Sequence, residues 1–144
     1  MSDCCLLVCL RPATYKRLIH GLYPKGTDGT EKDITAQKTD RLAEYGIQFP
    51  RKLPSISTYL SDQIKSDLNQ QRYGYVSIGL EAYRCLITQS SSEALLNLLE
   101  QDVEEILTLT IQHHDLFIVH CSLKTLLTYL KFYDHSQSNA SFSL

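Results

Sequence analysis

The chain has 144 residues, of which 43% are hydrophobic and 21% are charged, enough apolar material for one domain with a buried core. This composition excludes a chain that is disordered throughout. The formal net charge of −2 and the isoelectric point of about 6.2 argue against a dedicated nucleic-acid-binding domain, for which a basic surface is expected.

A cluster of thiols opens the chain. Three of the five cysteines, Cys4, Cys5 and Cys9, lie within the first nine residues among leucine and valine side chains. A thioester-linked fatty acid contributes about 0.8 kcal/mol per buried methylene, and two or three such chains hold a protein durably to a bilayer. The pattern predicts an S-palmitoylated membrane anchor arm over residues 1–11.

Basic residues follow the thiols directly. The first 25 residues contain Arg11, Lys16, Arg17 and Lys25 against the single acidic residue Asp3, a net charge of +3 for this segment. Each basic residue near an anionic leaflet adds about 1 kcal/mol to membrane binding. We therefore expect these four residues to bind anionic lipids of the inner leaflet.

Other roles for the cysteines are less favoured by the pattern. A zinc site lacks the C-x-x-C spacing, and the next His or Cys is His20. A secretory signal peptide would need a basic start where Asp3 stands, and Ser2 excludes N-myristoylation. Neighbouring cysteines rarely form a disulfide with each other, and no apolar stretch approaches the 18 residues of a membrane span. Unmodified thiols in a frayed terminus remain the alternative.

The first predicted helix begins at Pro12 and ends near Tyr23-Pro24. Its apolar positions recur at helical spacing, namely Tyr15, Leu18, Ile19 and Leu22. Lys16, Arg17 and His20 lie between them, which makes the polar face of this helix basic. Glycine and aspartate over residues 25–30 predict a loop after it.

Helical spacing continues along the rest of the chain. We predict helices from about residue 35 to 48, from 50–54 to 68, from 73 to 89, from 92 to about 114 and from 115 to 130. Ser91 or Ser92 is the expected N-cap of the fourth of these helices, and Asp115 is expected to begin the last.

Helices without a period-2 strand pattern predict an all-α fold over residues 12–133. The helices from residue 50 onward have the lengths of two antiparallel pairs, as in the stacked pairs of armadillo or HEAT-type α-solenoids. A compact helix bundle is the alternative, since no internal sequence repeat is evident. The polar, serine-rich tail over residues 134–144 is expected to be disordered.

Catalytic patterns are weak. The chain has no G-x-S-x-G, no Gly-rich phosphate loop and no H-E-x-x-H. His113, His114, His120 and Cys121 lie close in sequence, but Asp115 is expected to break the helix between them, so packing or solvation is favoured over metal binding. We predict no catalytic residue, cofactor or metal.

One segment resembles a known family. The run Leu10-Arg11-Pro12-Ala13-Thr14-Tyr15-Lys16-Arg17-Leu18, behind a cysteine cluster and before Tyr23-Pro24, resembles the amino terminus of the rolling blackout or eighty-five-requiring (EFR) family, with one extra residue before Tyr15. Further agreement lies in Lys52-Leu53, Ile56, Tyr59-Leu60, Asp67, Arg72-Tyr73-Gly74-Tyr75-Val76 and Leu80-Glu81-Ala82. The resemblance covers about residues 4 to 90.

The resemblance implies a non-catalytic scaffold built of armadillo and HEAT-type repeats. Members are palmitoylated on amino-terminal cysteines and hold a phosphatidylinositol 4-kinase complex on the cytoplasmic face of the plasma membrane, for synthesis of phosphatidylinositol 4-phosphate. By this resemblance Cys4, Cys5 and Cys9 are acyl sites, Arg11, Lys16 and Arg17 face anionic headgroups, and the partner is the tetratricopeptide-repeat scaffold subunit of the kinase complex. Since members are several times longer, we expect this chain to correspond to an amino-terminal fragment or a short form.

A second hypothesis remains open beside the lipid-anchored scaffold. The chain would then be a soluble helical interaction module whose apolar groove binds a partner helix, with cysteines that are incidental or redox-active. Release from membranes by hydroxylamine, which cleaves thioesters, separates the two hypotheses.

Overall fold

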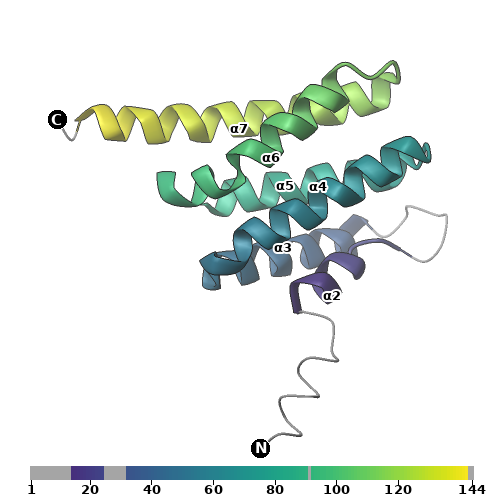
Figure 1. Cartoon of the computed structure of the whole chain (residues 1–144), viewed down its shortest axis with the longest axis horizontal. Coiled ribbons are helices and arrows are strands. Elements are labelled where there is room, and N and C mark those ends of the chain that lie inside the picture. The colour runs from purple at the N-terminus through teal and green to yellow at the C-terminus, as the bar shows by residue number, and fades with distance from the viewer. Residues whose placement is uncertain (1–13, 25–31, 91, 143–144) are drawn as a thin grey trace, which may run out of the picture.

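The computed structural model describes residues 14–24, 32–90 and 92–142, and side chains for 14–24, 36–90 and 92–134. This part of the chain is helical, without strands (Figure 1). Its elements are α2 (Thr14–His20), α3 (Lys32–Gln48), the 3₁₀-helix η1 (Pro50–Lys52), α4 (Leu53–Asn69), α5 (Tyr73–Gln89), α6 (Glu93–Ile111) and α7 (Leu116–Phe142). The all-α prediction is confirmed.

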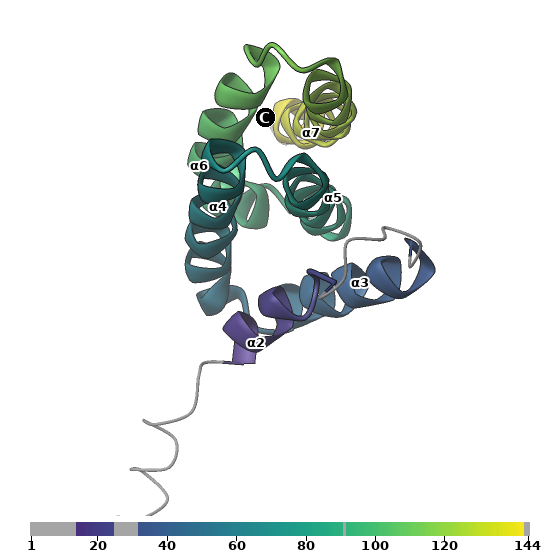
Figure 2. The same ribbon diagram turned by 90° about the vertical axis from the view of Figure 1, so that its right-hand side faces the viewer.

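The long helices form two layers. Helices α4 and α6 lie side by side in one layer, and α3, α5 and α7 follow one another in the second (Figure 2). The hairpins α4–α5 and α6–α7 therefore stack on each other as antiparallel pairs, each covering the apolar face of its neighbour. This arrangement is the predicted α-solenoid and not a compact bundle.

The helix ends follow local sequence signals. The Ser92 Oγ accepts a hydrogen bond from the Leu95 N–H at 3.3 Å, so Ser92 caps α6. The Asp115 Oδ1 accepts from the Phe117 N–H at 2.9 Å and from the Ile118 N–H at 3.3 Å, and so starts α7 as expected. Helix α3 begins three residues before the predicted start at about Thr35.

The turn between α4 and α5 is closed by the backbone. Gln71 has a φ of 59°, in the left-handed region, and the Arg72 N–H donates to the Asp67 carbonyl at 2.8 Å. The Gln71 N–H donates to the Leu68 carbonyl at 3.2 Å. These two bonds are those of a Schellman motif, which reverses the chain within a few residues and sets up the antiparallel hairpin.

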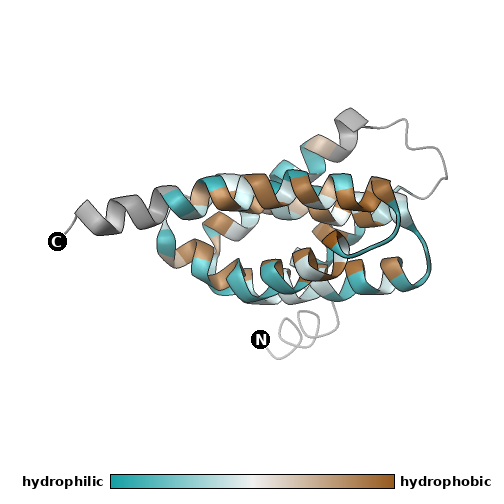
Figure 3. Cartoon of the chain, turned by 90° about the horizontal axis from the view of Figure 1, so that it is seen from above, coloured by the Kyte–Doolittle hydropathy of each residue, from teal (hydrophilic) through white to brown (hydrophobic). Residues whose placement is uncertain are grey.

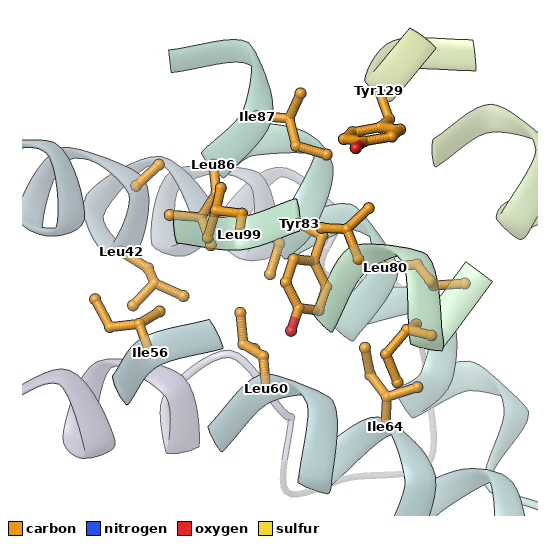
Figure 4. Packing of buried hydrophobic residues seen from close by; sticks show 14 of the residues in the cluster. Leu42, Ile56, Leu60, Ile64, Leu80, Tyr83, Leu86, Ile87, Leu99 and Tyr129 are labelled. Atoms are coloured by element: carbon orange, nitrogen blue, oxygen red, sulfur yellow. The ribbon is translucent and has the colours of Figure 1, made fainter. Parts of the chain in front are cut away.

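The core lies between the layers and is centred on α5 (Figure 4). Tyr83 is 1% exposed, and its hydroxyl donates to the Ser57 carbonyl at 2.5 Å and lies 3.2 Å from the Ser57 Oγ. Burial raises the pKa of the Tyr83 hydroxyl, with a smaller opposing effect from the Ser57 hydrogen bond. Other fully buried core residues are Leu42, Leu53, Ile56, Leu60, Ile64, Leu80, Leu86, Ile87 and Leu99.

The end of α7 differs from the expectation. The helix continues to Phe142, through the stretch that composition predicted to be a disordered tail after Tyr133. Extending an existing helix adds one hydrogen bond per residue without a new nucleation cost, so a polar sequence that would not start a helix can prolong one.

Candidate functional site

The predicted membrane-binding residues are only partly within the described chain. Cys4, Cys5, Cys9 and Arg11 precede it, and Lys25 lies in the gap over residues 25–31, so these predictions lie outside the described residues. Lys16 and Arg17 are placed, both on α2.

Helix α2 is docked against the domain by one apolar side. Ile19 and, just after the helix, Leu22 are 0% and 1% exposed, and the helix contacts α3 and α4. Arg17 and His20 are exposed and Lys16 is half-buried. The polar face of α2 is therefore basic, as predicted. Its apolar side packs on the domain and its basic side is directed outward.

Tyr59 of α4 organises this basic face. Its hydroxyl lies 2.6 Å from the His20 Nε2, and the Lys16 Nζ lies 5.7 Å from the centre of its ring, in cation–π range. The ring of Tyr15 meets it edge-on at 6.3 Å. In the sequence, Tyr59 is notable only within the family resemblance, and no local signal marks its contact with residues about 40 positions earlier.

The segment after α2 is fastened to α5. The Tyr75 hydroxyl donates to the Pro24 carbonyl at 2.9 Å, and the rings of Tyr23 and Tyr75 meet edge-on at 5.3 Å. The Tyr23 hydroxyl is buried without a hydrogen-bond partner among the described residues, and burial raises its pKa. The two ends of the α2 segment thus rest on α4 and α5, which restricts how the basic face can turn.

The histidines near the α6–α7 corner are packed against neighbouring groups. The His113 ring stacks on His114 at 4.3 Å and meets Tyr73 edge-on at 5.2 Å, while its Nδ1 accepts from the Asp115 N–H at 3.0 Å. His120 is exposed on α7, separated from His113 by the helix start at Asp115. Over the described side chains, no group of three or more His, Cys, Asp and Glu is placed to hold a metal ion.

Two cysteines lie in the described part of the chain. Cys85 and Cys121 are half-buried free thiols, and burial raises the pKa of each. A thiol with a raised pKa is a poor nucleophile at neutral pH, because the thiolate is the reactive form. Cys85 lines a shallow pocket with Asp40, Glu81 and Arg84.

Among the helices that the structure describes, none is both long enough and apolar enough to cross a membrane.

Comparison with known proteins identifies the helical region. Residues 39–133 match the family model described as EFR3, armadillo repeat. Protein EFR3 homolog B of Danio rerio is 37% identical over 73 residues, 51% of this chain and 8% of the relative. Protein EFR3 homolog A of Homo sapiens is 31% identical over 92 residues, and Protein EFR3 homolog cmp44E of Drosophila melanogaster is 32% identical over 98 residues.

The matched segments cover 64% and 67% of this chain in the last two comparisons, but 11% of each relative. The chain thus spans about a tenth of the length of these relatives. No solved structure matches the chain. The chain belongs to the EFR3 family, and its helices over residues 39–133 form the armadillo-repeat region of that family.

Proposed function

We propose that this chain is a peripheral anchor on the cytoplasmic face of the plasma membrane, where it helps to recruit a phosphatidylinositol 4-kinase complex. Membership of the EFR3 family supports the scaffold role. The observation that carries the anchoring role is the docked helix α2, which turns Arg17 and His20 outward directly behind the cysteine cluster.

The reach of the chain links the two membrane signals. Thr14, where α2 begins, is five positions after Cys9, and five extended residues span at most about 18 Å. Acyl chains on Cys4, Cys5 and Cys9 would therefore hold the basic face of α2 within about two Debye lengths of the headgroups. Electrostatic attraction is screened beyond about one Debye length, so it adds to acylation where the arm brings the basic face closer to the headgroups than this upper limit.

The acylation is tested in cells with the full chain carrying a fluorescent tag. We expect staining of the cell periphery, loss of that staining when Cys4, Cys5 and Cys9 are all changed to Ser, and release of the parent chain from membranes by hydroxylamine. Intact mass should show added acyl groups. Peripheral staining of a chain with bare thiols would contradict the anchor, and cytosolic staining of the parent would favour the soluble interaction module.

The basic face is tested separately on vesicles with unacylated protein. Arg17→Glu should weaken binding to phosphatidylserine-containing vesicles, whereas Arg17→Lys keeps the charge and should bind as the parent does. Vesicles of phosphatidylcholine alone and raised salt should abolish the difference. Equal binding of the Glu and Lys variants would show that Arg17 does not contact the membrane surface.

Recruitment of the kinase complex is tested last, because this chain spans about a tenth of its relatives. The tagged chain should enrich the kinase at the cell periphery, and the variant with the three cysteines replaced should not. Anchoring without enrichment would show that the recruiting surface lies outside the part of the relatives that this chain matches.

A further inference from the structure

An aromatic side chain is exposed at the corner between α3 and α4. Phe49 is 45% exposed, and the exposed residues Pro50, Arg51 and Lys52 of η1 follow it. We name these four residues the η1 corner. The other large apolar side chains exposed in the described part of the chain, Phe117 among them, lie on α6 and α7, and Figure 3 views the molecule from the α7 side. Phe49 therefore stands apart from them, at the opposite end of the stack.

The η1 corner is held in a fixed shape by backbone and ring contacts. The Lys52 N–H donates to the Phe49 carbonyl at 2.9 Å, and the Leu53 N–H donates to the Pro50 carbonyl. The Phe49 N–H donates to the Tyr45 carbonyl at 2.9 Å, and the centres of the two rings lie 4.8 Å apart. An exposed side chain on a corner that is already ordered loses little conformational entropy when it binds.

The η1 corner and the basic face of α2 lie at the same end of the stack. Helix α2 lies beside α3 and the amino-terminal end of α4, opposite α7 (Figure 2). Lys52 is seven residues before Tyr59, so the two lie on one side of α4, about 10 Å apart along its axis. Tyr59 is the residue that contacts Lys16 and His20 of α2. The side of α4 on which α2 rests therefore leads to the η1 corner.

This end of the molecule is basic. The described segments 14–24 and 45–61 contain no Asp or Glu, and their basic residues are Lys16, Arg17, Arg51 and Lys52. Glu44 and Asp62 flank the second segment, and each has a basic residue one helical turn away, Arg41 and Lys65 respectively. An apolar ring among uncompensated cations matches the surface of an anionic bilayer, where headgroups attract the cations and the acyl boundary accepts the ring.

We propose that the η1 corner is a second membrane contact, in which the Phe49 ring enters the boundary between headgroups and acyl chains while Arg51 and Lys52 bind anionic lipid headgroups. The inference rests on the proposed anchoring of this chain and names a further part of its membrane surface. Two observations favour a bilayer as the occupant. The charge of this end is complementary to an anionic leaflet, and the segment with the proposed acyl sites joins α2 at the same end.

A second contact has a consequence for orientation. One contact through α2 leaves the stack free to turn about that helix, whereas a further contact through the η1 corner fixes the α2 and α3 end of the stack against the bilayer. Helix α7, at the other end, is then directed away from the membrane (Figure 1).

Insertion of the ring is tested by fluorescence, because the chain contains no tryptophan. In the unacylated full chain, the emission of Phe49→Trp should shift to shorter wavelength when phosphatidylserine-containing vesicles are added, and brominated acyl chains should quench it. The matched control is Phe117→Trp, since Phe117 is 50% exposed at the start of α7, and its emission should not change. An unchanged emission of Phe49→Trp would overturn the proposal, including the case in which residues before α2 or another protein already cover the ring.

Binding to the same vesicles tests the contribution of each group. Phe49→Ser should weaken binding by at least about fivefold, whereas Phe117→Ser should bind as the parent does. Arg51→Glu should weaken binding by about tenfold. Its control is Lys124→Glu, which makes the same change of charge at an exposed position of α7 and should have little effect. Equal effects of the corner variants and their controls would exclude the η1 corner.

The outcomes separate this inference from the proposed anchor. Weaker binding of Arg17→Glu together with parent-like binding of Phe49→Ser and Arg51→Glu would keep the anchor and exclude the η1 corner. A parent that does not bind these vesicles would also exclude the corner, while acylation is judged by the staining of cells. Circular dichroism should show the helical content of the parent in every variant, and if Phe49→Ser unfolds, the conservative Phe49→Trp variant decides.

Discussion

Tyr83 joins two helices through one buried hydroxyl. Its ring fills the core between the layers, and the hydroxyl that an aromatic side chain brings with it is satisfied by Ser57 of α4. A buried polar atom with its partner in place costs little, whereas the same atom without a partner costs about 1–3 kcal/mol. The stability that Tyr83 contributes therefore depends on its hydrogen bond to Ser57 as well as on the burial of its ring.

Removal of the Tyr83 hydroxyl should destabilise the fold. Tyr83→Phe keeps the ring and deletes the hydrogen bond to the Ser57 carbonyl, so we expect a loss of about 1–2 kcal/mol in the free energy of unfolding, measured by urea denaturation. Ser57→Ala removes only the weaker 3.2 Å contact and should cost less. A larger loss for Ser57→Ala would contradict this assignment.

Asp67 makes stability depend on pH. The residue is 1% exposed, Gln63 donates to its two carboxylate oxygens at 3.3 and 3.2 Å, and burial raises the pKa of the carboxyl above its usual 3.8 despite opposing effects of Gln63 and Arg72. The fold therefore favours the neutral acid. The contribution of the neutral Asp67 carboxyl to the free energy of unfolding is fully present below pH 3.8, and it is lost as the pH rises through the folded-state pKa.

A neutral isostere should remove this dependence. Asp67→Asn keeps an acceptor for Gln63 and carries no charge, so it should be slightly more stable than the parent at neutral pH. The advantage should shrink as the pH falls toward 4, because the parent carboxyl then protonates. Urea denaturation of both proteins over this pH range measures the difference in their free energies of unfolding. An advantage of Asp67→Asn that grows on acidification would contradict a raised pKa of Asp67.

At the scale of the helices, Gly79 determines how closely α4 and α5 approach. A Cβ at Gly79 would lie 2.5 Å from the Ile64 Cγ1 and 2.9 Å from its Cδ1, closer than van der Waals contact. A Cβ at Gly74, on the same helix, would meet no atom within 4 Å. Gly79 is therefore needed for the close packing of α5 on Ile64, whereas the surroundings of Gly74 leave room for a side chain.

Substitution by alanine should separate the two glycines. Gly79→Ala should destabilise the protein by about 1–3 kcal/mol through overpacking, although alanine favours helix formation. Gly74→Ala should be neutral or stabilising by up to about 1 kcal/mol. Thermal and urea unfolding measure both changes, and a stabilised Gly79→Ala variant would show that α4 and α5 can move apart at no cost.

At the scale of the whole molecule, stability is distributed along a stack. Helix α5 contacts α3, α4 and α7, whereas the seven-residue α2 contacts α3 and α4 from the end of the array. In a solenoid each unit is stabilised mainly by its neighbours, so terminal units open first.

Hydrogen exchange should follow this order. We expect the slowest amide exchange in α5, at rates governed by global unfolding, and the fastest helical exchange in α2, measured by native-state exchange with mass spectrometry. Exchange in α2 as slow as in α5 would mean that the chain unfolds as one unit. Such a result would also imply a more rigid basic face than the fold indicates.

Helix bounds and helix caps could be predicted from the sequence, because they depend on residues a few positions apart. The 73–89 helix has the predicted bounds, and Ser92 and Asp115 act at the helix starts where their side chains can accept backbone N–H bonds. The helical continuation beyond Tyr133 was not foreseen, because composition reports the preference of an isolated segment and not of one joined to a formed helix.

The sequence alone determined the helices, the basic polar face of α2, the all-α class and the family, since helical periodicity and short motifs act between residues a few positions apart. Only the tertiary structure decided which helices share a layer, that Tyr59 meets His20 and Lys16, and which of the two apolar sides of α7 is buried. The physical reason is that periodicity tells which residues lie on one face, whereas burial depends on what the rest of the chain brings against that face.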